Sequence, residues 1–256
     1  MVKRIVLAFL LLAFLGCVRG PRVAPSIKRR KEDLLQGISR SHERLGSLRG
    51  RGRIAVSTGK KTYSGNFSLR YKNPGKLRID IYGPFGLQLL SVSVFDDSVL
   101  ALLPSANLAF ISHLSMPGVG GLGDVVTGDQ FKELVTATVS LPGGPGAEEI
   151  KCNFKDKVAT VIFSKSGYTN KLIVNPRTNA MLEREIYDDA GKILLTCYYR
   201  RFKSLKGWSR PYVVKIHEEE TGKGLEMVYE EQNLNAKIEN SEFQLNIPVG
   251  VEVIKN

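Results

Sequence analysis

Apolar residues recur at every second position between residues 62 and 94, which is the pattern of β-strands with one apolar and one polar face. Strands are expected over 62–71 and 77–81, with a third that continues to residue 94. The positions that would share the apolar face are Tyr63, Phe67, Leu69, Ile79, Ile81, Leu90 and Val92. We expect these side chains to line a concave pocket, although the alternation alone leaves open whether that face is filled.

The second half of the chain repeats the strand pattern, with short turns between the strands. The strands are expected over 149–155, 157–164, 169–175, 180–187, 192–202, 211–218 and 224–231. Segments such as Asp-Asp-Ala-Gly and Thr-Gly-Lys-Gly separate them. Such short connections favour an antiparallel meander of about a dozen strands in all.

Two segments have helical spacing instead. The first, expected over about 29–46, has one face formed by Leu34, Leu35, Ile38, His42 and Leu45. The second, over 127–139, has one face formed by Phe131, Leu134, Val135 and Thr138. Thr127 is a suitable N-cap for the second helix, and the segment Leu-Pro-Gly-Gly-Pro-Gly is expected to end it. The fold class is therefore α+β. A sheet this large curls, and we expect helices to cover its concave face.

The N-terminus indicates export. Lys3 and Arg4 precede an unbroken apolar run from residue 5 to residue 15, which is too short to span a membrane and has the length of a signal-peptide core. Gly16 and Cys17 follow it and resemble a bacterial lipobox, in which the cysteine is lipidated and becomes the new N-terminus. Phe14 departs from that motif, where leucine is commoner, and ordinary secretion with a chance cysteine is the alternative.

These features predict three parts of the chain. Residues 1–16 form the signal peptide, residues 17–28 form a tether from the lipidated cysteine, and residues 29–256 form a single folded domain. The tether contains two prolines and a glycine and has no periodicity.

Composition and charge narrow the function once export is assumed. The chain has 256 residues, of which 43% are hydrophobic, and a formal net charge of +12. Such a charge suits nucleic acid, anionic lipid or acidic proteins, but an exported lipoprotein meets no chromosome, so we expect no nucleic-acid binding. The segment Gly-Val-Gly-Gly-Leu-Gly at 118–123 matches a dinucleotide fingerprint but lacks the strand that must lead into it, so we expect no cofactor.

An enzymatic site is not indicated either. The chain contains no G-x-S-x-G, no pair of histidines four residues apart and no C-x-x-C. We therefore expect no catalytic residue and no metal ligand. Apart from Cys17, the cysteines are Cys152 and Cys197. The oxidising periplasm leaves a disulfide open, but several turns separate the two residues, and buried free thiols are the preferred interpretation.

Several segments in order resemble the LolA/LolB family, bacterial carriers and receptors that bring lipoproteins to the outer membrane. They include the lipobox, the first helix, a strand pair that ends in Gly-Pro-Phe-Gly, the helix followed by Leu-Pro, and the C-terminal Phe-Gln-Leu-Asn-Ile-Pro-Val-Gly. The greatest similarity is to LolB-like outer-membrane lipoproteins. The resemblance implies an incomplete antiparallel β-barrel whose helices lid a hydrophobic concavity that holds acyl chains.

The resemblance also bears on the turn formed by Gly83, Pro84, Phe85 and Gly86. In LolB the apolar residue of the matching tip protrudes toward the membrane, and Phe85 occupies that position here, where the family has leucine. The alternative is that Phe85 folds back onto Leu87 or Tyr82 and packs in a small satellite core.

The family function implied is that of a monomeric lipoprotein on the periplasmic side of the outer membrane. Its partners would be the acyl chains of client lipoproteins, a LolA-like periplasmic carrier protein and outer-membrane lipid. The competing interpretation is an envelope lipoprotein that uses the same fold to bind another lipid or a partner protein without sorting, since a fold does not fix a function.

Overall fold

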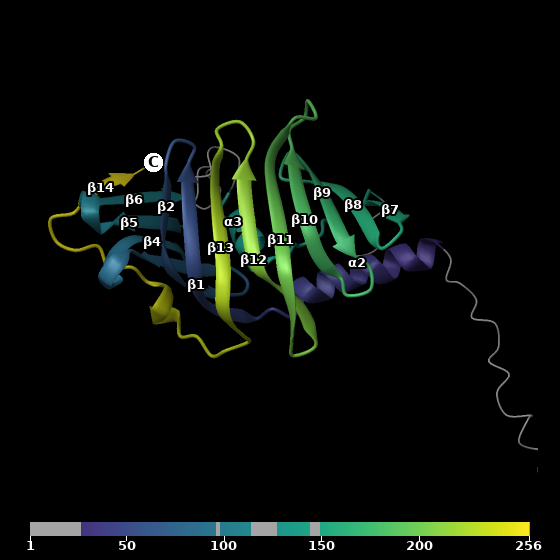
Figure 1. Cartoon of the computed structure of the whole chain (residues 1–256), viewed down its shortest axis with the longest axis horizontal. Helices are drawn as coiled ribbons and strands as arrows, with labels where there is room; N and C mark the ends of the chain where they lie inside the picture. Colours follow the sequence, from purple (N-terminus) through teal and green to yellow (C-terminus); the bar gives the residue numbers. More distant parts are fainter. Residues whose placement is uncertain (1–26, 96–97, 114–126, 144–148, 256) are drawn as a thin grey trace, which may run out of the picture. The chain divides into compact units, whose positions relative to one another are not determined.

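The computed structural model of the chain describes residues 27–95, 98–113, 127–143 and 149–255 (Figure 1). The chain divides into two units, Met1–Lys31 and Glu32–Asn256, and helix α2 (Ile27–Glu43) begins in the first and continues in the second. The expected signal peptide, Cys17, nearly all of the tether and the segment 118–123 lie outside the described residues, so the expectations for them remain predictions. No helix among the described residues is long and apolar enough to cross a membrane.

The second unit is built on one sheet, which contains fourteen strands in the described residues. Its first half consists of β1 (Ser47–Thr58), β2 (Thr62–Lys72), β3 (Lys76–Tyr82), β4 (Gln88–Phe95), β5 (Ser98–Leu103) and β6 (Leu108–His113). Its second half consists of β7 (Lys151–Lys155), β8 (Val158–Lys165), β9 (Tyr168–Asn175), β10 (Ala180–Tyr187), β11 (Ile193–Leu205), β12 (Trp208–Glu218) and β13 (Lys223–Leu234). The last strand is β14 (Glu252–Lys255).

The sheet consists of two antiparallel meanders that are joined in the middle. Strands β1 to β6 pair with their sequence neighbours, strands β7 to β13 do the same, and β1 pairs with β13. The short β14 extends the first meander by pairing with β6 in parallel, an arrangement that the turn signals did not predict. Strands β14 and β7 stand at the two ends of the strand order, so the sheet is curled but unclosed (Figure 1). The expected meander is thus confirmed within each half.

The apolar face predicted from the alternation is buried. Side chains of alternate strand positions form one apolar cluster, which includes Leu69, Ile79, Val94, Val161, Leu172, Val214 and Met227. Leu34, Leu35 and Ile38 of α2 belong to the same cluster. The burial of these three side chains explains why α2 is helical although it contains many charged residues. Tertiary packing supplies most of the stability of a short amphipathic helix.

Helix α3 (Gly128–Thr136) begins where the sequence predicted and ends earlier. Thr127 is its N-cap: the Thr127 hydroxyl accepts from the Gln130 N–H while the Gln130 side chain accepts from the Thr127 N–H. The helix ends at Ala137, whose φ of 51° lies in the left-handed region, before the Leu-Pro-Gly-Gly-Pro-Gly segment is reached. The expected terminator was therefore wrong, because a left-handed C-terminal residue had already stopped the helix.

The polar face of the first meander is partly covered by the segment that connects β13 to β14. Arg78 Nη1 donates to the carbonyl of Gln244 at 2.8 Å, and Lys72 Nζ donates to the carbonyl of Ile238 at 3.2 Å. Phe243 of the short 3-10 turn η5 (Asn240–Phe243) is fully buried here. As a result Asp80, which the alternation placed on a solvated face, is buried and ion-paired with Arg70 and Arg78.

Candidate functional site

The turn between β3 and β4 forms a rigid tip. Pro84, Phe85 and Gly86 make a single 3-10 turn, η1, that is closed by two backbone hydrogen bonds. The N–H of Gly83 donates to the carbonyl of Leu87 at 2.8 Å, and the N–H of Leu87 donates to the carbonyl of Pro84 at 3.3 Å. Proline fixes one backbone angle and the closing bonds restrain others, so the Cα–Cβ bond of the residue at the apex is held in one direction.

Phe85 occupies that apex with its side chain fully exposed, at 101% of the reference area. The alternative in which Phe85 packs back onto Leu87 or Tyr82 is therefore wrong. Its φ of 59° and ψ of 18° lie in the left-handed region, which costs a residue with a Cβ about 1–2 kcal/mol. An exposed apolar side chain on a strained backbone gains nothing from packing, and such positions concentrate at functional sites.

Other exposed apolar residues lie on the neighbouring connections. Leu87 is 65% exposed, and Val249, in the loop before β14, is fully exposed. That loop is held to the β5–β6 turn, because the side-chain amide of Asn107 donates to the carbonyl of Gly250 at 2.8 Å. Strands β3 to β6 are sheet neighbours that alternate in direction, so the β3–β4 and β5–β6 turns lie at the same end of the sheet. This end, which we call the apolar end, carries Phe85, Leu87 and Val249.

The seven residues expected to line a pocket differ in how deeply they are buried. Phe67, Leu69, Ile79 and Val92 are buried in the main apolar cluster, and Ile81 and Leu90 are half-buried against it. Tyr63, near the start of β2, is 55% exposed. The structure thus brings six of them to one apolar face. That they line a cavity for a ligand remains a prediction.

A buried ionic cluster, which the sequence analysis did not single out, joins α3 to the second meander. Arg184 Nη1 donates to Glu133 Oε2 at 2.9 Å, and Lys165 Nζ donates to Glu133 Oε1 at 2.6 Å. Asn170 Oδ1 accepts from Nε and Nη2 of Arg184. Burial alone would raise the pKa of Glu133, but the charges of Arg184 and Lys165 outweigh it, and the pKa lies at about 2. The Glu133 carboxylate is paired with two cations from the strands, so the cluster is suited to holding α3 in place rather than to chemistry.

A pocket of about 620 Å³ lies beside this cluster and is lined by polar groups such as His42, Gln130, Lys132 and Glu133. Nδ1 of His42 and the side-chain nitrogen of Gln130 have no hydrogen-bond partner there. Among the described residues no group of three or more His, Cys, Asp or Glu side chains is placed to hold a metal ion.

The two cysteines of the described domain form no disulfide. Cys197 of β11 is buried and Cys152 of β7 is half-buried. Three strands separate β7 from β11 in the sheet. Buried thiols outside a disulfide were the preferred interpretation of the sequence; neither cysteine is in a disulfide, and Cys152 is less buried than expected.

Comparison with known proteins was made in sequence and in structure. No protein-family model matches the chain, and no curated protein matches it in sequence. Solved structures match its fold. A LolA superfamily protein from Nitrosomonas europaea is 14% identical, with a TM-score of 0.59 over 84% of this chain and 97% of that one.

Two further structures match to the same degree. A domain provisionally named an outer membrane lipoprotein-sorting protein domain, from Vibrio parahaemolyticus, is 14% identical, with a TM-score of 0.59 over 82% of this chain and 97% of its own. A DUF1329 family protein from Desulfovibrio piger is 12% identical, with a TM-score of 0.58 over 84% of this chain and 98% of its own. At these identities the likeness concerns the fold.

Proposed function

Because the chain has a LolA/LolB-like fold, we propose that it is an outer-membrane lipoprotein that binds lipoprotein acyl chains and helps to insert lipoproteins into the outer membrane. It acts as a monomer, anchored through lipidated Cys17 on the periplasmic face. It receives its client from a LolA-like periplasmic carrier. It is not an enzyme, and transfer runs downhill, because the acyl chains leave a confined site for bulk lipid.

The acyl chains bind on the apolar face of the curled sheet. In this proposal α2 and α3 cover the concave side, and the pocket beneath them is lined by residues such as Phe67, Leu69 and Ile79. These side chains now pack with Leu34 and Phe131 of the helices in one cluster. A chain can enter only if the helices shift away from the sheet, so binding of the client and helix movement are coupled.

The observation that carries the proposal is the exposure of Phe85 at a rigid, strained tip. A phenylalanine that enters the membrane interface gains about 1.5–3 kcal/mol, which is too little to anchor a protein and suits a reversible contact. Leu87 and Val249 extend the same apolar end. The apolar end therefore dips into the outer membrane at the moment of transfer, while the lipid on Cys17 provides the lasting attachment.

Delivery of a lipoprotein to liposomes tests this function. The client is loaded onto the protein, outer-membrane-like liposomes are added, and the fraction of client in the floated liposomes is followed. Phe85→Glu should reduce the delivery rate about tenfold, because it removes the apolar side chain and brings a charge to the lipid surface. Phe85→Leu should deliver at nearly the rate of the unmodified protein.

The matched control is Ser166→Glu, which places the same charge at another exposed hairpin tip. Ser166 has a φ of 53°, close to that of Phe85. The Ser166→Glu protein should deliver normally. Equal delivery by the Phe85→Glu protein and the unmodified one would overturn the membrane role of the tip. Equal loss of client binding and delivery would show that Phe85 belongs to the binding site instead.

A second candidate is an envelope lipoprotein that uses the fold to bind another lipid or a partner protein without sorting. The close packing of the apolar cluster favours it, since Leu69 and Leu134 are both fully buried without a ligand. A fluorescent fatty-acid probe separates the two. Saturable binding at micromolar probe, with displacement by a lipoprotein, supports acyl-chain transfer, and the absence of binding supports the second candidate.

A further inference from the structure

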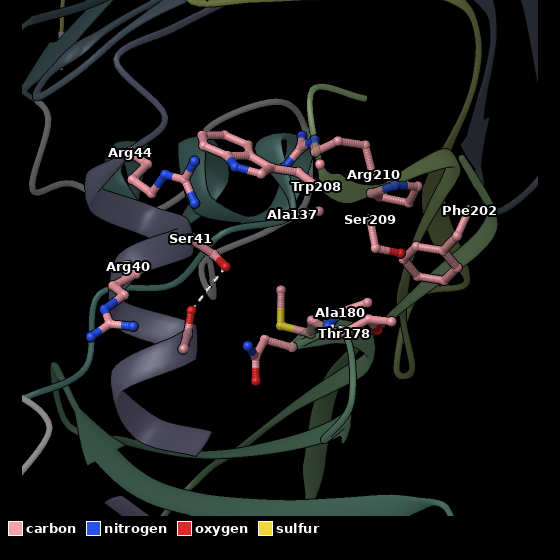
Figure 2. A pocket seen from close by; sticks show the side chains of 15 residues that line it. Arg40, Ser41, Arg44, Ala137, Thr178, Ala180, Phe202, Trp208, Ser209 and Arg210 are labelled. Atoms are coloured by element: carbon pink, nitrogen blue, oxygen red, sulfur yellow. Dashed lines mark hydrogen bonds between the residues drawn. The ribbon is translucent and has the colours of Figure 1, made fainter. Parts of the chain in front are cut away.

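A second cavity, of about 200 Å³, opens between α2 and the ends of the β9–β10 and β11–β12 hairpins (Figure 2). Ser41, in the last turn of α2, and Arg44, directly after the helix, contribute to one wall. Trp208, Ser209 and Arg210 at the start of β12 form the opposite wall. The cavity is smaller than the roughly 300–1,000 Å³ of pockets that enclose a drug-sized ligand, so it fits a headgroup or a small ion.

The charged groups of this cavity are all positive. Arg40, Arg44 and Arg210 are among its lining residues, which include neither aspartate nor glutamate. Figure 2 shows Arg44 reaching toward Trp208, while the side chain of Arg40 extends away from the cavity. Arg44 Cζ lies 4.8 Å from the centroid of a Trp208 ring, a cation–π contact that leaves the guanidinium N–H groups available to an acceptor.

Arg210 carries a charge that the surrounding protein does not neutralise. Its side chain is 5% exposed, and it donates to the carbonyl of Thr136 at 2.6 Å and to the side-chain oxygen of Gln232 at 3.4 Å. No carboxylate of the described residues forms an ion pair with it. Burial lowers the pKa of this guanidinium, and the ionisable side chains that act against burial are tyrosines, which are neutral when protonated. Buried charges in proteins are normally paired, so an unpaired one beside a cavity points to a ligand of opposite charge.

The hydrogen bond to the carbonyl of Thr136 gives Arg210 a structural role, but it compensates only part of the positive charge of the guanidinium. Thr136 is the last residue of α3, and cations bind well at the negative end of a helix dipole. That end amounts to roughly half an elementary charge, which leaves the rest of the guanidinium charge unmatched.

The cavity also has an apolar part. Trp208, Phe202 and Met181 all line it, and Phe202 and Trp208 also pack against the main apolar cluster. A ligand that fills the cavity would therefore meet cationic donors on one side and aromatic and aliphatic surface on the other. That combination suits an amphiphile, whose charged group and hydrocarbon part are joined.

We propose that this cavity is a binding site for an oxyanion headgroup, a phosphate or carboxylate, that is attached to an acyl chain. Arg44 and Arg210 donate to the oxyanion, Ser209 supplies a hydroxyl donor, and the first atoms of the chain pack on Trp208 and Met181. This site goes beyond the proposed sorting function, because binding of acyl chains to an apolar face does not call for a negative group.

The fluorescence of Trp208, the single tryptophan of the chain, reports on the cavity directly. The full-length protein in a non-ionic detergent is titrated with dihexanoylphosphatidic acid, with inorganic phosphate and with the uncharged dihexanoylglycerol. The phosphatidate should change the emission in a saturable way and bind about tenfold more tightly than phosphate, and dihexanoylglycerol should bind more weakly than both.

Variants then assign the binding to the cavity. Arg44→Gln should weaken the phosphatidate about tenfold, because it removes charged hydrogen bonds, and Arg44→Lys should keep most of the affinity. Arg53→Gln removes the same charge from an exposed side chain of β1 that does not line the cavity, and it should change the affinity by no more than about twofold.

Each contrary result has a defined meaning. Equal binding of phosphatidate and phosphate would overturn the acyl part of the proposal and leave free phosphate as the ligand. Equal binding of dihexanoylglycerol, equal weakening by Arg53→Gln and Arg44→Gln, or no response of Trp208 to either anion would overturn the oxyanion site itself.

Discussion

Arg184 and Glu133 meet inside the second unit, where Nη1 of the arginine lies 2.9 Å from Oε2 of the glutamate. Arg184 is fully buried on β10, and Glu133 is buried on α3. The pair therefore links a helix to the sheet through largely buried side chains, and it makes the stability of the protein sensitive to acid.

The first prediction concerns that sensitivity. The folded-state pKa of Glu133 is about 2, below the ordinary value of 4.5, so the stabilisation that it provides is complete above pH 4.5 and is lost as the pH falls toward 2. The difference corresponds to about 3 kcal/mol. Urea unfolding from neutral pH down to about pH 3 should show this loss. Glu133→Gln should lower the unfolding free energy at neutral pH by about 3 kcal/mol and flatten the acid dependence.

The control for Glu133→Gln is Glu231→Gln, which removes one carboxylate from an exposed ion pair with Arg51. Its effect at neutral pH should stay below about 1 kcal/mol. An acid dependence that is unchanged in the Glu133→Gln protein would contradict the role given to this carboxylate. Part of the acid dependence should remain in that variant, because Arg78 and Ser91 outweigh the effect of burial and lower the pKa of Asp80 as well.

The second prediction concerns the junction of the two meanders. Gly52 lies at a bulge where β1 pairs with β13, and a Cβ at this position would collide with the backbone carbonyl of Val228. Backbone in the middle of a sheet cannot move aside easily, so Gly52→Ala should lower the unfolding free energy by about 3 kcal/mol. Gly46→Ala is the control, because a Cβ there would lie 3.5 Å from Asn235 Oδ1, an ordinary contact. Similar stability of both variants would contradict the close approach.

The third prediction separates stability from function at the tip. Truncation of the Phe85 side chain removes no packing contact, since the side chain is fully exposed. Glycine also tolerates a φ of 59° better than phenylalanine. Phe85→Gly should therefore raise the unfolding free energy by about 1 kcal/mol while reducing delivery to liposomes. Ser105→Gly, at the neighbouring exposed turn η2 (Pro104–Ala106), relieves no such strain and should lower stability slightly. A less stable Phe85→Gly protein would indicate that the phenylalanine packs against the fold.

The fourth prediction concerns thiol reactivity. Burial raises the pKa of Cys197 to about 12, so its thiol is neither accessible nor ionised at neutral pH. Iodoacetamide should modify Cys152 of the native protein and leave Cys197 unmodified, as read by mass spectrometry of the peptides. In the Cys152→Ser protein, Cys197 should react only after denaturant is added. Rapid modification of Cys197 without denaturant would show that the sheet opens near β11.

The strands could be predicted because one face of the sheet is apolar and the other polar. Alternation in β8 to β13 reflects that asymmetry directly, and each of these strands forms where it was expected. The parallel strand β14 could not be found in the same way. It has four residues, and Val253 and Ile254 alone do not define a period. Its position depends on the β6 edge, to which it binds through the backbone.

The buried charges were missed for a different reason, although the sequence holds a signal for them. Arg184 is two residues from Ile186, and Arg210 is two residues from Tyr212. Both arginines therefore lie on the same face of their strands as these buried residues. A charged residue at such a position must find a partner or a ligand inside. The partner of Arg184 comes from α3, which is distant in sequence, so the alternation could point to the buried position without naming Glu133.

The pairing of β1 with β13 also governs when the protein can fold. The N–H of Gly46 donates to Asn235 Oδ1 across 189 positions of the chain, and β1 has no sequence-local partner on that side. Long-range pairing of this kind makes folding slow, because the entropic cost of closing a large loop comes before the stabilising contacts form. The first meander therefore cannot be joined to the second until nearly the whole polypeptide has been synthesised.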